Sequence, residues 1–420
     1  MSDTYHEPAR EIPIARTADV LIVGGSFGGV AAALAAARLG RRVVVTEETP
    51  WIGGQATSQA VPFDEHPWIE SYGRTRSYAS LREGIRDYYR RCYPLTAAAR
   101  ADAAFNPGAG LVSRLCCEPR VVHAVLEQML ASHRAAGRIV TLTEHRPVAA
   151  DVQGDRVRAV TVEDARTGAR RTIEAAYVLD ATELGDLLPL ARVEYVTGAE
   201  SQTETSEPSA VEGPPQPQTM QAFTHCFALD HIAGEDHTIE RPRDYALYRD
   251  RFAIDADKGP VLFELPGSDR REYNPKSNWL YRRMIYAGNF APGAFAGDIT
   301  LACWSWNQYG LGSIVDVSEE EKTHHLAQAR QLSLSCIHWL QTEAPRPEDG
   351  GTGYPGLRPR GDVMGSLDAL ALAPYIRESR RIRAETTVLE QHVRNTTGPE
   401  RFADTVGVGC YRIDIHSGAK

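Results

Sequence analysis

A run of small residues from Gly24 to Gly29 is the strongest candidate for chemistry in this sequence. It reads Gly24-Gly25-Ser26-Phe27-Gly28-Gly29 and follows an apolar segment at 19–23. Aligned with G-x-G-x-x-G, Gly24 and Gly29 take the outer positions, and the small Ser26 takes the middle one. Glycines in this pattern permit a tight turn, close approach of the backbone to a pyrophosphate, and close packing of the following helix.

An acidic residue at a suitable distance strengthens this interpretation. Glu47 lies 23 residues after Gly24 and ends a second apolar segment. A carboxylate there accepts hydrogen bonds from ribose hydroxyls. We prefer Glu47 to its neighbour Glu48, because successive side chains of a strand point to opposite faces. The pattern predicts a dinucleotide site, and a plain glycine loop is the alternative.

The elements around these residues predict a parallel βαβ unit with a right-handed crossover. Segments 19–23 and 42–46 have the length and apolarity of strands, and the alanine-rich segment 30–39 predicts a helix that stops at Gly40. Further predicted elements are helices at 75–93, 119–136 and 375–393, a strand at 139–142, and a β-hairpin of 156–162 with 170–179. In the last of these helices, Arg377 and Arg381 would share a face.

Three pieces of sequence, 22–33, 47–55 and 178–186, resemble the FAD-dependent oxidoreductases of the glutathione-reductase-like superfamily. More narrowly, the chain is similar to a bacterial family of FAD-dependent oxidoreductases that carries the xanthan-lyase name, and segment 374–382 extends the similarity. The resemblance implies FAD as the cofactor. The implied contacts are Gly24, Gly25, Ser26, Phe27, Gly28, Gly29, Glu47, Glu48, Gly53, Gly54, Gln55, Ala181, Thr182 and Asp186.

The order of these pieces favours FAD over NAD. The pair Gly53-Gly54 would leave room for a bulky cofactor to pass the ribose acid, and Asp180 to Thr182 would return the chain to the same site. An NAD dehydrogenase needs neither feature, although each alone is also an ordinary turn or strand end. An NAD-binding dehydrogenase and a truncated or degenerate flavoprotein acting as a non-catalytic binding module stay as alternatives.

The expected fold class is α/β, with a Rossmann-like FAD-binding domain and a second, mixed α+β substrate domain. The first domain would hold a parallel sheet and a β-hairpin or three-stranded insert. We expect the FAD-binding domain at 1–200, a flexible Ser/Thr/Glu/Pro-rich loop at 201–218, the substrate domain at 219–365, and a return to the FAD domain at 366–420. The resemblance implies a further C-terminal segment, so we expect a truncated chain.

Several side chains are candidates for acid–base or substrate-binding work beside the flavin. His66 follows the Gly53-Gly54 turn and suits a general base, and His416 shares a strand face with Asp414. Arg380 belongs to an arginine cluster that suits a substrate carboxylate or the pyrophosphate. Structural or solvated roles are the alternatives for each. The aromatic run 304–309 suits either a substrate pocket or a core. No metal is expected, since His324-His325 lacks metal-ligand spacing.

Composition limits the partners. The 420 residues exceed one ordinary core, so at least two domains are expected. A net charge of -9 does not favour general electrostatic binding to nucleic acid or to an anionic membrane surface. No apolar run could span a bilayer and 1–16 lacks a secretory pattern, so we expect a cytoplasmic protein. Without a second glycine motif for NAD(P)H, the flavin would be recharged by its small-molecule substrate, oxygen or an electron-transfer partner. The sequence leaves open whether the chain forms a homodimer.

Overall fold

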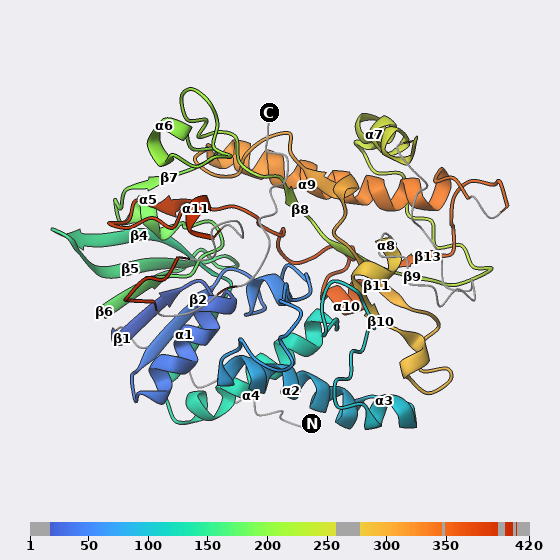
Figure 1. The fold of residues 1–420 in the computed structure, drawn as a ribbon, viewed down its shortest axis with the longest axis horizontal. Coiled ribbons are helices and arrows are strands. Elements are labelled where there is room, and N and C mark those ends of the chain that lie inside the picture. Colours follow the sequence, from blue (N-terminus) through green and yellow to red (C-terminus); the bar gives the residue numbers. More distant parts are fainter. Residues whose placement is uncertain (1–16, 258–277, 347–348, 394–399, 406–408, 410–420) are drawn as a thin grey trace, which may run out of the picture.

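The computed structural model describes residues 17–257, 278–346, 349–393, 400–405 and 409. Two sheets organise this part of the chain (Figure 1). The first sheet has six strands in the order β3-β2-β1-β6-β5-β4, of which the first four are parallel and the last two antiparallel. Its strands are β1 (Thr17–Val23), β2 (Val43–Glu47), β3 (Ile139–Thr143), β4 (His145–Gln153), β5 (Arg156–Asp164) and β6 (Arg170–Asp180).

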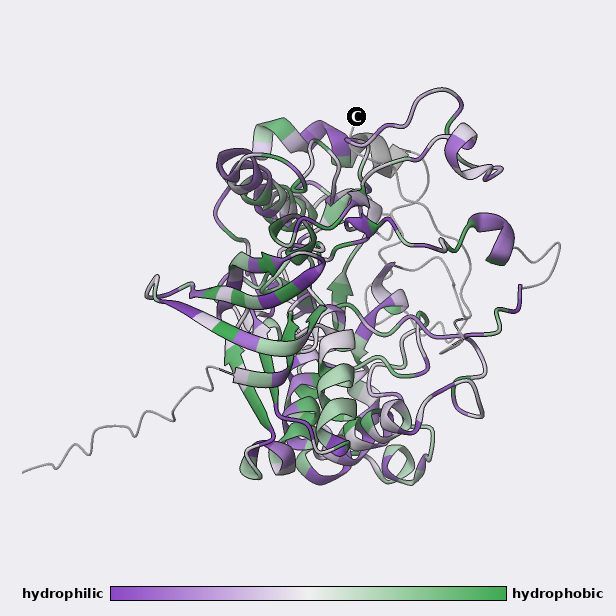
Figure 2. Ribbon diagram, turned by 90° about the vertical axis from the view of Figure 1, so that its left-hand side faces the viewer, coloured by the Kyte–Doolittle hydropathy of each residue, from purple (hydrophilic) through white to green (hydrophobic). Residues whose placement is uncertain are grey.

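Both faces of β2 and of the carboxyl half of β1 are buried, which explains the continuous apolar residues of these two strands. Ile22 and Val45 point into one hydrophobic cluster together with α1, α2 and α4. Leu21, Val23 and Val44 point into a second cluster on the opposite face. Figure 2 shows hydrophobic residues concentrated in these packed strands and helices, with hydrophilic residues on the outer loops. The predicted strands and hairpin are confirmed, and β4 completes the three-stranded insert.

The helices of this half begin at recognisable caps. Ser26, Thr75 and Thr96 each accept a hydrogen bond from the backbone of the first turn, and Pro119 starts α4 without losing a helical hydrogen bond. The helices are α1 (Phe27–Arg38), α2 (Arg76–Cys92), α3 (Ala97–Ala101), α4 (Pro119–Ala135) and α5 (Leu187–Leu190). The predictions of helices at 30–39, 75–93 and 119–136 are confirmed.

The second sheet is antiparallel and packs against the long helix α9 (Glu319–Thr342), which runs along the top of Figure 1 with α7 (Tyr245–Asp257) beside it. Its order is β10-β11-β9-β13, with β9 (Phe227–His231), β10 (Arg283–Ile285), β11 (Ile299–Ala302) and β13 (Leu357–Pro359). Trp304, Trp306 and Tyr309 are buried in the core under α9, so the aromatic run 304–309 is a core feature.

Short elements connect the two halves. They are β7 (Tyr195–Val196), α6 (Gln202–Thr205), β8 (Phe223–Thr224), α8 (Asn278–Tyr281), β12 (Gln308–Tyr309), α10 (Gly361–Met364), β14 (Arg381–Ile382), α11 (Glu390–Val393), and three 3-10 turns at Gly54–Ala56, Ala287–Asn289 and Ser305–Asn307. An α/β fold with a second, mixed part is thus confirmed, while the domain boundaries and the truncation stay predictions. No helix in the described residues is long and apolar enough to cross a membrane.

The predicted helix over 375–393 is wrong. Tyr375 exchanges two backbone hydrogen bonds with Thr224, at 2.7 and 3.1 Å, and β14 pairs with β7. Only Glu390–Val393 is helical. Arg377 and Arg381 therefore share no helix face. Backbone pairing with distant segments overrides the helical propensity of this arginine- and glutamate-rich stretch, because tertiary contacts outweigh the few tenths of a kcal/mol per residue of propensity.

Candidate cofactor site

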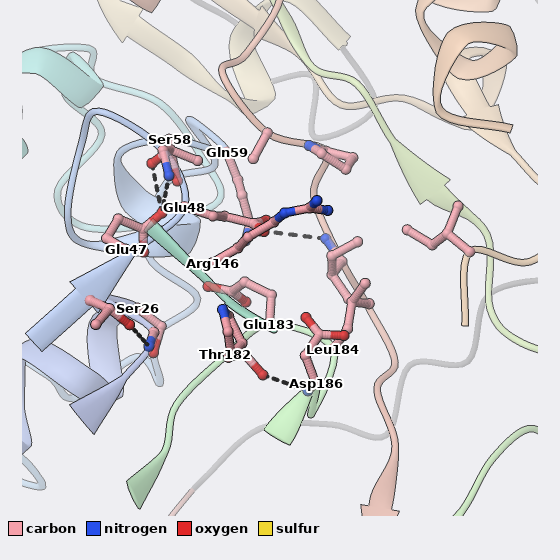
Figure 3. A pocket seen from close by; sticks show the side chains of 18 of the residues that line it. Ser26, Glu47, Glu48, Ser58, Gln59, Arg146, Thr182, Glu183, Leu184 and Asp186 are labelled. Atoms are coloured by element: carbon pink, nitrogen blue, oxygen red, sulfur yellow. Dashed lines mark hydrogen bonds between the residues drawn. The ribbon is translucent and has the colours of Figure 1, made fainter. Parts of the chain in front are cut away.

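A cavity of about 290 Å³ lies at the carboxyl ends of β1, β2 and β6 (Figure 3). Open α/β sheets bind ligands in the crevice at this edge. Seven of the predicted cofactor residues line it, namely Gly24, Ser26, Glu47, Glu48, Ala181, Thr182 and Asp186. These residues come from three separate strand ends, so the parallel pairing of the sheet is what brings them together.

The outer glycines of the motif are required by close backbone contacts. A Cβ atom on Gly29 would lie 2.2 Å from the carbonyl oxygen of Gly24, and one on Gly24 would lie 2.2 Å from the carbonyl oxygen of Ala181. Gly24 also has a φ of 101°, which side chains disfavour. Ser26, by contrast, accepts a hydrogen bond from the Gly29 amide at 3.3 Å and caps α1. The serine that replaces glycine at the middle position of the motif therefore serves as the N-cap of α1.

Glu47 is held at the mouth of the glycine turn. Its carboxylate accepts hydrogen bonds from the amide of Gly25 at 3.0 Å and from the amide and hydroxyl of Thr49 at 2.9 and 2.7 Å. Burial of the side chain raises the pKa of Glu47 to about 7, although the bonds from Thr49 oppose this shift. Glu48 is exposed but also lines the cavity, so the expectation that it faces away from the site is wrong.

Replacing Glu47 with glutamine should remove a pH dependence from the stability of the FAD-free protein. Since the folded-state pKa is raised from 4.5 to about 7, the contribution of Glu47 to stability is fully present below pH 4.5 and is lost as pH rises through 7. The full effect is about 3 kcal/mol at 1.36 kcal/mol per pKa unit. Denaturant titrations of both proteins from pH 4.5 to 8.5 measure it. Parallel pH profiles would contradict the assignment.

The Gly53-Gly54-Gln55 turn packs behind the motif and does not line the cavity. The amide of Gly53 donates to the carbonyl oxygen of Gly25 at 2.7 Å, and a Cβ on Gly54 would lie 2.3 Å from a carboxylate oxygen of Glu183. Gln55 donates to Asp64 at 3.1 Å.

Phe27, in the first turn of α1, packs against the rings of Phe63 and Tyr78. Gly28 is exposed on that helix. These predicted contact residues support the shape of the glycine turn from behind.

The loop after β6 is anchored at both ends. The amide of Ala181 donates to Val23 at 2.7 Å, and the hydroxyl of Thr182 accepts a hydrogen bond from the amide of Asp186 at 2.7 Å. Arg380 donates to Asp186 at 3.1 Å and to the carbonyl oxygen of Leu184 at 2.9 Å. Arg380 therefore positions this loop and does not itself line the cavity; its catalytic role stays a prediction.

The histidine candidates are not brought to the cavity in the described residues. His66 lies on a loop, where its Nε2 is 3.3 Å from the carbonyl oxygen of Gly73 and its ring neighbours Trp68 and Tyr72. It is not among the residues that line the cavity. His416 and Asp414 fall outside the described residues. Among the described residues, seven of the cofactor candidates therefore line the cavity, whereas His66 and Arg380 do not.

Sequence reasoning missed several residues that line the cavity. They are Ser58, Gln59, Arg146, Glu183, Lys322 and Ile376, from five separate segments. Glu183, inside segment 178–186, and Ile376, inside segment 374–382, belong to stretches that carried the family resemblance, whereas the other four had no sequence signal. Arg146 and Lys322 bring positive charge from β4 and α9. The Nε2 atom of Gln59 is buried and has no hydrogen-bond partner among the described residues.

These groups fit a dinucleotide. The start of α1 offers backbone N–H groups and a helix dipole to a pyrophosphate, and the glycine contacts leave no room for side chains there. The side-chain amide of Gln59 lines the same space and adds a neutral hydrogen-bond donor. Glu47 presents a carboxylate for the ribose hydroxyls.

Solved structures with partial similarity include three flavoproteins. They are a glycerol-3-phosphate dehydrogenase from Bacillus halodurans complexed with FAD (12% identity, TM-score 0.30, 51% of this chain and 40% of that chain), a geranylgeranyl bacteriochlorophyll reductase-like protein from Thermoplasma acidophilum (15%, 0.30, 52% and 48%), and the myxobacterial chondrochloren halogenase CndH (15%, 0.27, 52% and 45%). Each alignment spans less than half of the other chain, and scores this low do not establish a common overall fold.

A search of curated proteins returns no match. The family model described as FAD dependent oxidoreductase matches residues 19–420, which include the glycine motif and the segments around Glu47 and Asp186. Placement in the glutathione-reductase-like superfamily and the xanthan-lyase name stay predictions. FAD is the cofactor. The match spans nearly the whole chain and agrees with the cavity at the strand ends, so the chain belongs to the family of FAD-dependent oxidoreductases.

Proposed function

We propose that the chain catalyses hydride transfer between a small organic substrate and N5 of FAD. The observation that supports this most directly is the cavity at the carboxyl ends of β1, β2 and β6, where Gly24, Glu47 and Thr182 meet. FAD supplies hydride chemistry when bound, and the protein supplies binding, orientation and control of protons. The family match supports the oxidoreductase class, whereas the substrate and the direction of transfer are part of the proposal.

Different residues of the cavity would bind different parts of FAD. The first turn of α1 would hold the pyrophosphate, with the cationic side chains of Arg146 and Lys322 facing the same cavity. Glu47 would accept hydrogen bonds from the adenosine ribose. Arg380 would keep the loop of Thr182 and Asp186 in position through its bonds to Asp186 and Leu184.

The first test is a visible spectrum of the purified protein before and after adding FAD, with mass spectrometry of the released cofactor. Under the proposal, one FAD binds per chain, and anaerobic addition of a substrate bleaches the flavin bands. A protein that binds NAD and no flavin would overturn the proposal. If the protein binds FAD but no compound from a panel of alcohols, amines and acids reduces the bound flavin, the chain has a binding role only. Oxygen uptake by the reduced protein would separate oxygen from a partner protein as the acceptor.

Replacing Glu183 with glutamine should strengthen FAD binding about three- to tenfold, because its carboxylate lies close to the start of α1, where the pyrophosphate would bind, and like charges a few ångströms apart repel. Its carboxylate adjoins Gly54 and the first turn of α1, and burial raises the pKa of Glu183. Equilibrium titration of FAD fluorescence measures the change. Glu319→Gln is the control, since this acid lines the same cavity but is 80% exposed. Equal effects of both changes would contradict a local role.

A further inference from the structure

Two cysteines face each other between β9 and β11. These strands are antiparallel and pair Phe227 with Ala302, so Cys226, one residue before, lies opposite Cys303, one residue after. The Cys226 thiol donates to the carbonyl oxygen of Thr224 at 3.9 Å, and each of the two cysteines shifts the pKa of the other. Directly opposed residues in such a pair have Cα atoms about 4.5–5.5 Å apart, within the roughly 4.4–6.8 Å that a disulfide requires. A disulfide could form here without moving the strands.

Two guanidinium groups converge on Cys303. Arg377 donates to its sulfur at 3.6 Å, and Arg282 donates to its carbonyl oxygen at 2.7 Å. Neither arginine forms an ion pair with a carboxylate in the described part of the chain, whereas neighbouring Arg283 pairs with Asp298 at 2.7 Å. Interaction with Cys226 and the charges of the two arginines lower the pKa of Cys303, although burial opposes this shift. The site therefore favours a thiolate at Cys303.

The other buried thiols lack this environment. Cys336 is fully buried, no other described cysteine contributes to its electrostatics, and burial raises its pKa. Burial likewise raises the pKa of Cys116 to about 12. Buried thiols in apolar surroundings are normally inert, while a thiolate beside arginines reacts with oxidants. Because Cys303 is only 3% exposed, a reactant must be small to reach it.

We propose that Cys226 and Cys303 form a redox-active pair that hydrogen peroxide converts to a disulfide. The thiolate of Cys303 attacks one peroxide oxygen, the O–O bond breaks, and a sulfenic acid forms while the other oxygen leaves as hydroxide. The sulfur of Cys226 then attacks the sulfenic sulfur, which forms the S–S bond and releases the sulfenic oxygen. The thiol proton and one from solvent complete two waters. Two thiols are oxidised and one hydroperoxide is reduced. The pair is independent of the proposed substrate reaction.

The test is peptide mass spectrometry of the full chain after brief exposure to hydrogen peroxide and alkylation. We expect a linked Cys226–Cys303 peptide that dithiothreitol reverses. Cys226→Ser should leave a sulfenic acid on Cys303 that dimedone traps, and Cys303→Ser should leave Cys226 reduced. Cys336→Ser is the control and should form the same linked peptide as the unmodified protein.

A variant that keeps both cysteines separates reactivity from folding. At pH 5, Arg377→Gln should slow the oxidation of Cys303 about tenfold if it raises the thiol pKa by one unit from about 6, because the thiolate fraction falls in proportion when the pH lies below both pKa values. Circular dichroism checks that the variant is folded. A folded wild-type protein in which Cys303 reacts no faster than Cys336, or forms no link to Cys226, would overturn the proposal. An unchanged oxidation rate in Arg377→Gln would do so as well.

Discussion

Replacing Gly29 with alanine is expected to weaken FAD binding at least 100-fold, which corresponds to about 2.7 kcal/mol. The added Cβ would lie 2.2 Å from the carbonyl oxygen of Gly24 and 3.3 Å from the Cβ of Ala181. Neither backbone can yield without moving α1 away from β1 and β6. The first turn of α1 would then lose its place at the cavity. Overpacking of this kind also costs about 1–3 kcal/mol of stability.

The neighbouring glycine provides a matched control. Gly28 is in the same helical turn, but a Cβ there would meet only the hydroxyl oxygen of Ser26 at 3.9 Å. Gly28→Ala should bind FAD as the unmodified protein does and should gain slightly in stability, because alanine favours a helix. Fluorescence titration with FAD and urea unfolding measure both properties. If the two alanine variants bind FAD equally well, the close packing of α1 on the sheet is not what shapes the site.

Replacing Glu65 with alanine is expected to destabilise the protein by about 3 kcal/mol, because it removes the buried one of the two carboxylates that pair with the buried guanidinium of Arg82 and leaves only Glu70. The side chains of Arg82 and Glu65 are 1% and 2% exposed and form an ion pair. Glu65 also accepts hydrogen bonds from Tyr78 and, at 2.9 Å, from Ser113. These bonds tie the loop that contains His66 to helix α2, so loosening of that loop should accompany the loss of stability.

Two further variants isolate the buried charge as the cause. Asp87→Ala removes an ion pair with Arg90 on the same helix, where the aspartate is 59% exposed, and should change stability by no more than about 1 kcal/mol. The double variant Glu65→Ala with Arg82→Met removes both charges and should recover much of the loss. Urea unfolding at pH 7 compares all three. If the double variant is less stable than Glu65→Ala alone, packing and not the unpaired charge explains the effect.

Local patterns in the sequence were sufficient for the cofactor half of the molecule. The spacing of Gly24, Gly29 and Glu47 reflects contacts within one βαβ unit, where neighbours in sequence are neighbours in space. The alternation and length of the apolar segments likewise predicted every strand of the first sheet except β4, and the helices α1, α2 and α4. The serine at position 26, where the motif usually has glycine, also has a local explanation, because Ser26 caps the helix that follows.

Only the tertiary structure decided what closes the site and what surrounds Cys303. Gln59, Arg146 and Lys322 line one cavity although they come from segments far apart in the chain. No local sequence pattern predicts that such distant residues lie close together. The segment after Pro374 has helical composition yet pairs with Thr224 and β7, because its backbone hydrogen bonds are made with distant partners. The same segment brings Arg377 to Cys303. Sequence thus determined the elements that bind the cofactor, and long-range pairing determined their neighbours.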